Sequence, residues 1–516
     1  MAGEARVEIT ADSNPALNLV DLGRLPSEES ALALVGEEYA REHRVLPLRI
    51  EHDGTLLVAF SDHVDPSLLH DLRVLTRFEV QGVAATPSSV QEAITQRYKV
   101  FSQVDRWVEA YAARNPAQPD LESVLALGSE SSPVVQIVDR LISQGLRDRA
   151  SDIHIEPQRD KVRVRFRVDG ILVDAVSLPK AVGPSICSRL KVMANMDIVD
   201  RHRAQDGQIR IDRGERHVDI RVSTAETLWG EKVVLRLLDQ ARTILSLHEL
   251  GLNQANYSQL RSLLHSPYGM IVVSGPTGSG KTTSLYAAIK ELDPVAQNIT
   301  TIEDPVEYTF DNINQIQIRK VANLSFANGL RAILRQDPDV ILVGEIRDLE
   351  TAEIAVQSAL TGHLVLSSLH ATDAAGVIQR FIEMGIEGFL VSSSLIGVVA
   401  QRLVRCICAF CREPYAPSVE EMALWRQYST DTKKTFYHGR GCEQCAGTGY
   451  RGRVGVFEVL RMTDDVKRMV SLRASAHEIN ARAIEEGMLG MRADAVSKVA
   501  ADVTTLSEVI RCVWLN

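Results

Sequence analysis

The chain has 516 residues, more than one ordinary domain holds, so its length predicts three or four domains. Its composition, 45% hydrophobic and 24% charged residues, excludes a disordered or fibrous protein, and its net charge of −10 argues against wholesale wrapping by nucleic acid or by an anionic membrane. No apolar run approaches the roughly 18 residues of a membrane-spanning helix, and the acidic opening segment lacks the apolar region of a secretory signal, so we expect a cytoplasmic protein that reaches any membrane through partners.

The first hundred residues mix short helical patterns with one strand-like run, TLLVAF at 55–60. The segment 112–132 is rich in Pro, Ser, Ala and acidic residues, a composition typical of a linker. We therefore expect a small α/β module over 1–100 and a linker over 101–132.

Apolar and charged residues alternate strictly from Lys161, which predicts a β-strand, and Asp169-Gly170 is a hairpin turn signal. A second hairpin is predicted over 208–223. Together they predict an antiparallel sheet within a domain at 133–245, with one core face and one strongly basic face. On the pattern alone, that basic face is either a solvated surface or a surface for a phosphate or a partner. In the first strand Val162, Val164, Phe166 and Val168 share one face, and Arg163, Arg165 and Arg167 share the other.

The pattern changes at about Met270, where short apolar runs begin to alternate with helical segments. This alternation predicts a parallel sheet flanked by helices, in a domain that we place at 246–402. The overall fold class expected is therefore a multidomain α/β protein.

A complete phosphate-loop motif, GxxxxGK[ST], lies between the predicted strand MIVVS and a predicted helix. Its glycines allow backbone N–H groups to converge on phosphate, and the helix that follows turns its positive dipole end toward the anion. Lys281 supplies a charge for the β- and γ-phosphates, and the Thr282 hydroxyl is the expected Mg²⁺ ligand. The predicted nucleotide-binding residues are Gly275, Pro276, Thr277, Gly278, Ser279, Gly280, Lys281, Thr282 and Thr283.

Acidic residues end two of the predicted strands. Glu345 follows the run VILV, and Glu303 and Glu307 follow the run ITTI. Carboxylates at the carboxyl ends of parallel strands meet in one crevice, where they can hold Mg²⁺ or activate water. The alternative is two solvent-exposed strand ends. His363 and His370 bracket another strand, and each is either a γ-phosphate sensor or a structural residue.

Six of the seven cysteines lie after residue 400. Cys408 and Cys411 form one CxxC pair, and Cys442 and Cys445 form another, which is the set of four thiolates that suits Zn²⁺. A redox pair and free cysteines are the alternatives. We place this tetracysteine element at 403–455 and a helical region at 456–516. Cys406 is spaced awkwardly for the same site, and Cys187 and Cys512 are interpreted as core residues.

Taken together, these motifs resemble those of the secretion ATPases of type II secretion systems and type IV pilus assembly, over nearly the whole chain. In this resemblance GPTGSGKTT is the phosphate loop, TIEDPVEY the aspartate box, RAILRQDPDVILVGEIRD the acidic strand, TGHLVLSSLHATDA the histidine box, and the two CxxC pairs the zinc element. ASDIHIEP and RFRVDG resemble the second N-terminal domain of the family, and REHRVLPLRIEHDGTLLVAF resembles its first.

The resemblance implies a RecA-like motor core, a PAS-like second N-terminal domain, and a hexameric ring that hydrolyses ATP between these two parts. Lys281 and Thr282 would then bind phosphate and Mg²⁺. Glu345 would coordinate metal or activate water, with help from Glu303 and Glu307, and either Glu345 or Glu303 would be the base. It further implies that His363 and His370 sense the nucleotide, and that Arg221 of the basic sheet reaches the γ-phosphate, which we expect to happen in a neighbouring subunit.

The chain departs from the family pattern in two places. Where the family usually shows Pro-Gln-Asp-Gly-Arg, this chain reads Ala204-Gln-Asp-Gly-Gln208, so the arginine expected there is missing. Arg203 or Arg210 are candidates to replace it. Ala495 and Asp502 stand where glycines are common, which affects helix packing more than chemistry.

The function expected is therefore a hexameric ATPase that drives pseudopilus assembly in type II secretion, with pilus extension as the alternative. ATP, Mg²⁺ and Zn²⁺ are the expected cofactors. The expected partners are an inner-membrane docking protein that binds 1–100, an inner-membrane platform protein and other copies of the chain, with no nucleic acid. A nucleic-acid motor is disfavoured by the net charge of −10, and a scaffold with little turnover is disfavoured by the intact acidic boxes.

Overall fold

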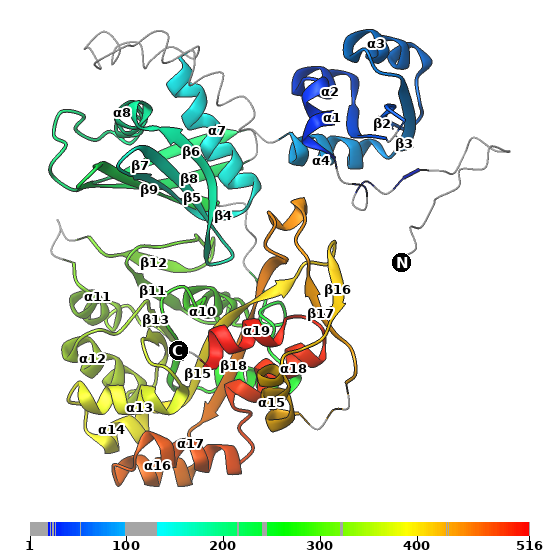
Figure 1. Ribbon diagram of the computed structural model, residues 1–516. Coiled ribbons are helices and arrows are strands. Elements are labelled where there is room, and N and C mark those ends of the chain that lie inside the picture. Colours follow the sequence, from blue (N-terminus) through cyan, green and yellow to red (C-terminus); the bar gives the residue numbers. More distant parts are fainter. Residues whose placement is uncertain are drawn as a thin grey trace.

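The computed structural model describes residues 19–98 and 132–514, apart from 21, 23, 24, 26, 52, 214, 215, 240–244, 320–323, 430 and 432. Within these residues the strands form one main sheet in each of three successive parts of the chain, with a further two-stranded sheet in the cysteine-rich segment of the third part, and helices cover the faces of the main sheets (Figure 1). Apart from Ser132, the predicted linker lies outside the described residues. No helix in the described parts is long and apolar enough to cross a bilayer.

The first part is a small α/β module with its own apolar core. Its strands lie in the order β1-β2-β3, with β1 and β2 antiparallel and β2 and β3 parallel. Two of its helices begin with a proline in the first helical turn. The residue before that proline, Asp65 in one helix and Thr86 in the other, caps the helix with its side chain. The elements are α1 (Glu29–Leu34), α2 (Glu37–His43), β1 (Val45–Ile50), β2 (Leu56–Ser61), α3 (Pro66–Thr76), β3 (Val80–Ala85) and α4 (Pro87–Arg97).

The second part is an antiparallel sheet with the strand order β6-β5-β4-β9-β8-β7. In β5 the predicted apolar face is buried in the core, and its arginines lie on the opposite face. The predicted second hairpin is β7 and β8, in register from Gln205↔Thr224 to Arg213↔Arg216. The elements are α7 (Pro133–Arg147), β4 (Ala150–Pro157), β5 (Lys161–Val168), β6 (Ile171–Pro179), α8 (Gly183–Met193), β7 (Gln205–Arg213), β8 (Arg216–Thr227) and β9 (Gly230–Asp239).

The third part is built on a sheet with the order β12-β11-β13-β14-β10-β15-β18, parallel except for the pair β15 and β18. The two faces of β10 enter different cores: Met270 and Val272 pack with α11 to α14, and Ile271 and Val273 pack with α9 and α10. This core carries the predicted alternation of strands and helices. Its elements are α9 (Gln254–Leu264), β10 (Gly269–Ser274), α10 (Lys281–Lys290), β11 (Ile299–Glu303), β12 (Asn314–Gln317), α11 (Phe326–Ile333), β13 (Val340–Val343), α12 (Leu349–Leu360), β14 (Leu364–Leu369), α13 (Ala374–Glu383), α14 (Gly388–Ser394), β15 (Leu395–Ile407) and β18 (Tyr450–Arg461).

The cysteine-rich segment is an insertion between the paired strands β15 and β18. The expected domain boundaries at 402/403 and 455/456 therefore fall inside strands of the sheet. The helices after β18 contribute to the same apolar core as α12 and α13, so they extend the third part. The inserted elements are β16 (Arg412–Tyr415), α15 (Val419–Tyr428), β17 (Phe436–Gly439) and the 3₁₀ turn η5 (Glu443–Cys445), and the helices are α16 (Asp464–Ser471), α17 (Ala476–Glu485), α18 (Met491–Ala500), α19 (Leu506–Val509) and the π-helical turn Ile510–Trp514.

Candidate functional site

The phosphate-loop motif joins the carboxyl end of β10 to the start of α10. Gly278 and Gly280 have φ values of 78° and 89°, in the left-handed region where glycine is favoured. A Cβ atom at Gly275 would lie 2.4 Å from the Gln401 carbonyl oxygen, so a larger residue would not fit there. The loop therefore has the tight backbone path that an anion cradle requires.

The Lys281 ammonium is turned back onto this loop. Its Nζ donates to the carbonyl oxygens of Gly275 at 2.9 Å and Pro276 at 3.3 Å, and it lies 3.4 Å from Nδ1 of His370. Burial lowers the pKa of Lys281, and the nearby Glu345 carboxylate opposes that shift. A bound phosphate would offer the ammonium an anionic partner in place of neutral carbonyls.

Glu345 and His370 lie beside Lys281 because they follow β13 and β14: β14 is the neighbour of β10 in the sheet order, and β13 is the next strand beyond it. Glu345 pairs with Arg347 at 2.5 Å, and its other oxygen is 3.9 Å from Nε2 of His370. Burial and the charge of Lys281 lower the pKa of His370, which keeps the imidazole neutral near pH 7. These three predicted site residues thus come together at one edge of the sheet.

Glu303 ends β11 and is buried, with 3% of its surface exposed. Its carboxylate accepts hydrogen bonds from the Tyr286 hydroxyl at 2.5 Å, from Thr301 Oγ1 at 2.6 Å and from Gln315 Nε2 at 3.3 Å. Burial and this carboxylate raise the pKa of Tyr286 well above its usual range. Sequence reasoning missed Tyr286, which lies on α10 and whose hydroxyl reaches Glu303 at the end of β11.

Glu307 connects the aspartate box to the basic sheet. Its backbone N–H donates to the Tyr286 oxygen at 3.2 Å, and its side chain lies 3.6 Å from Nη1 of Arg221, on β8. This contact lies within one chain, whereas the sequence analysis expected Arg221 to serve a neighbouring subunit. Arg221 faces Glu307 because it alternates with the buried residues Ile220 and Val222.

Two groups of predicted residues have other partners than Lys281, Glu345 and His370. His363 precedes β14, at the end of that strand opposite His370, and its Nδ1 is 2.9 Å from the Ser358 carbonyl oxygen. Gln208 is the register partner of Arg221, and its amide donates to Asp219 at 3.3 Å. Arg210 also pairs with Asp219, at 3.4 Å, and Arg203 pairs with Asp200 at 3.7 Å.

A cavity of about 730 Å³ separates the antiparallel-sheet domain from the phosphate loop. One wall includes Gly280 and Thr283 at the start of α10, with Tyr286 one turn further along. The facing wall includes Leu237 and the segment 146–151. The cavity lies beside the loop that would hold phosphates and has mixed apolar and polar walls, as a nucleoside requires.

The four cysteines of the two CxxC pairs gather in one cluster, with all Sγ atoms within 4.8 Å of one another. The Sγ–Sγ distances include 3.8 Å for Cys408–Cys442, 3.9 Å for Cys411–Cys445 and 3.7 Å for Cys442–Cys445. A tetrahedral ion with metal–sulfur bonds of about 2.3 Å would place its thiolates about 3.8 Å apart, so the cluster fits Zn²⁺. Cys406 lies on β15 outside the cluster, and burial raises its pKa to about 11. Cys187 and Cys512 are buried, as expected for core residues.

Comparisons with known proteins show which family the sequence matches. The sequence matches the family described as Type II/IV secretion system protein over residues 128–511, and the MshEN domain over residues 16–103. It is 46% identical over 489 residues to the Type II secretion system protein E of Dickeya dadantii, which covers 92% of this chain and 95% of the relative. It is 41% identical over 517 residues to the type IV pilus assembly ATPase PilB of Myxococcus xanthus, covering 96% of this chain and 88% of that protein.

A solved structure also resembles the chain. The X-ray structure of the Legionella pneumophila ATPase DotB aligns with a TM-score of 0.55 at 21% sequence identity, over 72% of this chain and 94% of that one. At this identity the likeness concerns the fold alone.

Proposed function

Because the chain belongs to the Type II/IV secretion system protein family and is an ATPase of that family, we propose that it is a hexameric motor that drives pseudopilus assembly in type II protein secretion. One observation carries the proposal: Lys281, Glu345 and His370 meet at the phosphate loop, where charge on a transferred phosphoryl group would develop. The RecA-like nature of the core and the PAS-like nature of the antiparallel-sheet domain belong to the same proposal.

In this function Lys281 binds the β- and γ-phosphates, the backbone N–H groups of residues 277–283 supply donors, and Thr282 holds Mg²⁺, which neutralises phosphate charge when bound. Glu345 activates the attacking water, because it lies near Lys281 and only one of its oxygens is held by Arg347. Glu303 already accepts hydrogen bonds from three side chains, which suits a carboxylate that fixes the positions of Tyr286 and Glu307.

The arginine and histidine roles also stay proposals. Arg221, held beside Glu307, is placed to exchange that carboxylate for the γ-phosphate, which supports a contact within its own chain. His370 contacts both Lys281 and Glu345, so it can report the nucleotide state of the site. His363 lies at the other end of β14, and a sensing role for it has no support from its contacts.

We propose Zn²⁺ for the tetracysteine cluster, in a structural role, because the four thiols form a closed set with no position left for a substrate. Backbone N–H groups of Cys442 and Gly449 donate to Cys445 Sγ at 3.1 and 3.2 Å, which stabilises a thiolate there.

Recruitment is assigned to the first module. The MshEN match over 16–103 supports a partner-binding role for residues 1–100, and we propose that they dock on the cytoplasmic domain of an inner-membrane protein while the ring acts on a platform protein. This would place the motor on the cytoplasmic face of the inner membrane. No nucleic acid is part of this function.

The test compares two machines. Deleting the gene should abolish export of secreted proteins while leaving surface pili in place, and the purified protein should release phosphate from ATP in the presence of Mg²⁺. Pilus extension is the alternative that the PilB relative supports, and loss of pili with normal secretion would select it. ATPase activity that depends on single-stranded DNA would instead favour a nucleic-acid motor.

A further inference from the structure

One short contact joins the antiparallel-sheet domain to the sheet that carries the phosphate loop. Asp169, in the turn between β5 and β6, accepts a hydrogen bond from the Gly452 N–H at 2.9 Å. The same carboxylate lies 3.7 Å from Nη2 of Arg149 and 3.9 Å from Nε of Arg453. Its side chain is only 12% exposed, so the contact is largely shielded from solvent.

The Gly452 N–H can make this contact because Gly452 has no register partner in the pairing of β15 with β18. The register of β15 and β18 runs to Arg405↔Arg453 and then jumps to Ile407↔Tyr450, which leaves Gly452 in a bulge with φ +83°. Such a bulge turns a backbone donor away from the partner strand. Asp169, which accepts the hydrogen bond from Gly452, itself has a φ of +47°. This is a left-handed conformation that Asp tolerates better than most residues.

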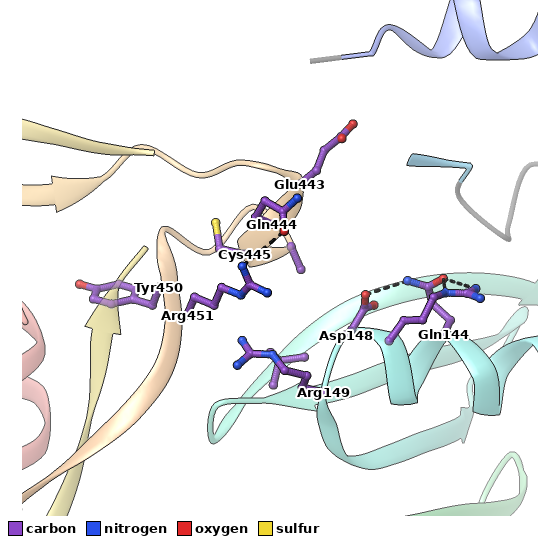
Figure 2. Close-up of a pocket in the computed structure, with 11 residues that line it drawn as sticks. Gln144, Asp148, Arg149, Glu443, Gln444, Cys445, Tyr450 and Arg451 are labelled. Carbon is purple, nitrogen blue, oxygen red and sulfur yellow. Dashed lines mark hydrogen bonds between the residues drawn. The ribbon is translucent and has the colours of Figure 1, made fainter. Parts of the chain in front are cut away.

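The contact lies on the wall of the cavity beside the phosphate loop. Asp169, Gly452 and Arg453 line that cavity together with Gly280 and Thr283. Figure 2 shows the neighbouring part of the joint, where Arg149 from the turn before β4 and Arg451 from β18 extend into the same gap. This joint therefore helps to hold the antiparallel-sheet domain over the cavity, together with the Arg221–Glu307 contact.

We propose that Asp169 is a positioning residue for nucleotide binding: it holds the two walls at the separation that a nucleoside fills. The inference rests on the proposed ATPase function and deepens it. Asp169 acts through Gly452 and the two arginines, so its loss should weaken the binding of ATP and of ADP alike. The chemical step should change little, because Lys281 and Glu345 keep their contacts.

The test uses Asp169→Gly, which removes the carboxylate while keeping a residue that readily adopts the left-handed conformation. Asp169→Asn keeps an acceptor for the Gly452 N–H but loses the charge that pairs with the arginines. Asp62→Gly is a matched control, because Asp62 also has a positive φ, of 64°, and is exposed between β2 and α3 in the first module, away from the phosphate loop.

We expect Asp169→Gly to raise the Kd for mant-ADP and mant-ATP and the KM for ATP by about tenfold, the size of effect that a lost charge-assisted hydrogen bond produces. Its kcat should stay within about twofold of the wild type. The values for Asp169→Asn should fall between those of Asp169→Gly and the wild type, and Asp62→Gly should match the wild type. Hydrogen exchange should become faster in the peptide 449–456 of Asp169→Gly, since its Gly452 N–H has lost its acceptor.

Unchanged nucleotide affinity in Asp169→Gly would overturn the inference, whether or not exchange in 449–456 becomes faster. So would a loss confined to kcat, or an equal loss of affinity in Asp62→Gly. Wild-type protein that binds mant-ADP without hydrolysing ATP would contradict the proposed function, and the Kd comparison would still decide the role of Asp169. Wild-type protein that binds neither nucleotide would overturn both.

Discussion

Glu303 and Glu345, the two carboxylates considered as the catalytic base, differ in how many partners their oxygens already have. Glu303 is buried and accepts hydrogen bonds from Tyr286, Thr301 and Gln315. Glu345 has 19% of its side chain exposed; Arg347 pairs with one of its oxygens at 2.5 Å, and among the described residues the other oxygen has only His370 near it, at 3.9 Å. A general base needs a free oxygen within reach of the attacking water, which favours Glu345.

Glu345→Gln should therefore still bind ATP but hydrolyse it at least about a hundredfold more slowly, because an amide keeps the shape of the side chain and cannot accept the proton. Phosphate release under single-turnover conditions, together with the Kd for mant-ATP, measures the two effects separately. Glu303→Gln is the comparison. If Glu345→Gln kept wild-type turnover while Glu303→Gln did not, the base would be Glu303.

Sequence reasoning located the residues at strand ends but not their partners. It placed His363 and His370 around one strand, yet only the sheet order shows that the end carrying His370 is the one beside Lys281. It could not find Tyr286, because a helical tyrosine with buried neighbours looks like a core residue until its hydroxyl is seen to reach Glu303. Pairings of this kind depend on tertiary packing and leave no local pattern.

At the scale of elements, the tetracysteine insertion depends on its thiols. Purified protein should contain about one zinc per chain, and Cys408→Ser should lose it and destabilise 408–449, because metal binding contributes directly to the folding of such small elements. Metal analysis and limited proteolysis measure both effects. Cys406→Ser is the control, since Cys406 lies outside the cluster. Folded wild-type protein without zinc would rule the assignment out.

A second element-scale prediction concerns Glu508, whose buried carboxylate joins α19 to β15. It pairs with Arg405 at 2.7 Å and with Arg511 at 2.6 Å, and none of its side chain is exposed. Burial alone would raise the pKa of Glu508, but hydrogen bonds from Arg511 and Arg405 outweigh it and lower the pKa from 4.5 to about 2. A lowered carboxyl pKa means stability that is present above the unfolded value and is lost as the pH falls toward 2.

Glu508→Gln should therefore lower the free energy of unfolding by about 3 kcal/mol near neutral pH, because the largely buried Arg405, 13% exposed, loses its carboxylate partner. The difference from the wild type should shrink as the pH falls from 4.5 toward about 2, as the wild-type carboxylate itself becomes protonated. Denaturant unfolding at several pH values measures this. Glu350→Gln, which removes an exposed pair with Arg331, should change little.

The elements were predictable where their pattern was local. The short apolar runs at 269–274, 299–303, 340–343 and 364–369 are strands of a parallel sheet, as the alternation with helices predicted. The pairing of β15 with β18 was not foreseen, because it joins segments separated by the whole cysteine-rich insertion. Periodicity within either segment says nothing about a partner so distant in the sequence, so the boundaries expected from composition cut through both strands.

At the scale of the whole molecule, the Arg221–Glu307 contact raises the question of which subunit each arginine serves. If Arg221 completes the site of its own chain, mixing Arg221→Ala with Lys281→Ala subunits should restore no activity, because every site would lack one of the two residues. We expect that outcome from the contact within the chain. The measurement is the rate of ATP turnover at several mixing ratios of the two variants, with ring assembly verified by native mass spectrometry. Partial recovery of activity would instead support the arrangement in trans that the resemblance suggested.

The insertion of the cysteine-rich segment between β15 and β18 also bears on how such a chain can evolve. Ile407 and Tyr450 are register partners, so the segment leaves and re-enters the sheet at neighbouring positions. The entropic cost of closing a loop there grows only slowly with its length. Descendants of this gene could therefore lengthen, shorten or exchange the segment while the remaining sheet stays unchanged. We expect such insertions and deletions to accumulate at the ends of the β15 and β18 pair, where the segment begins and ends.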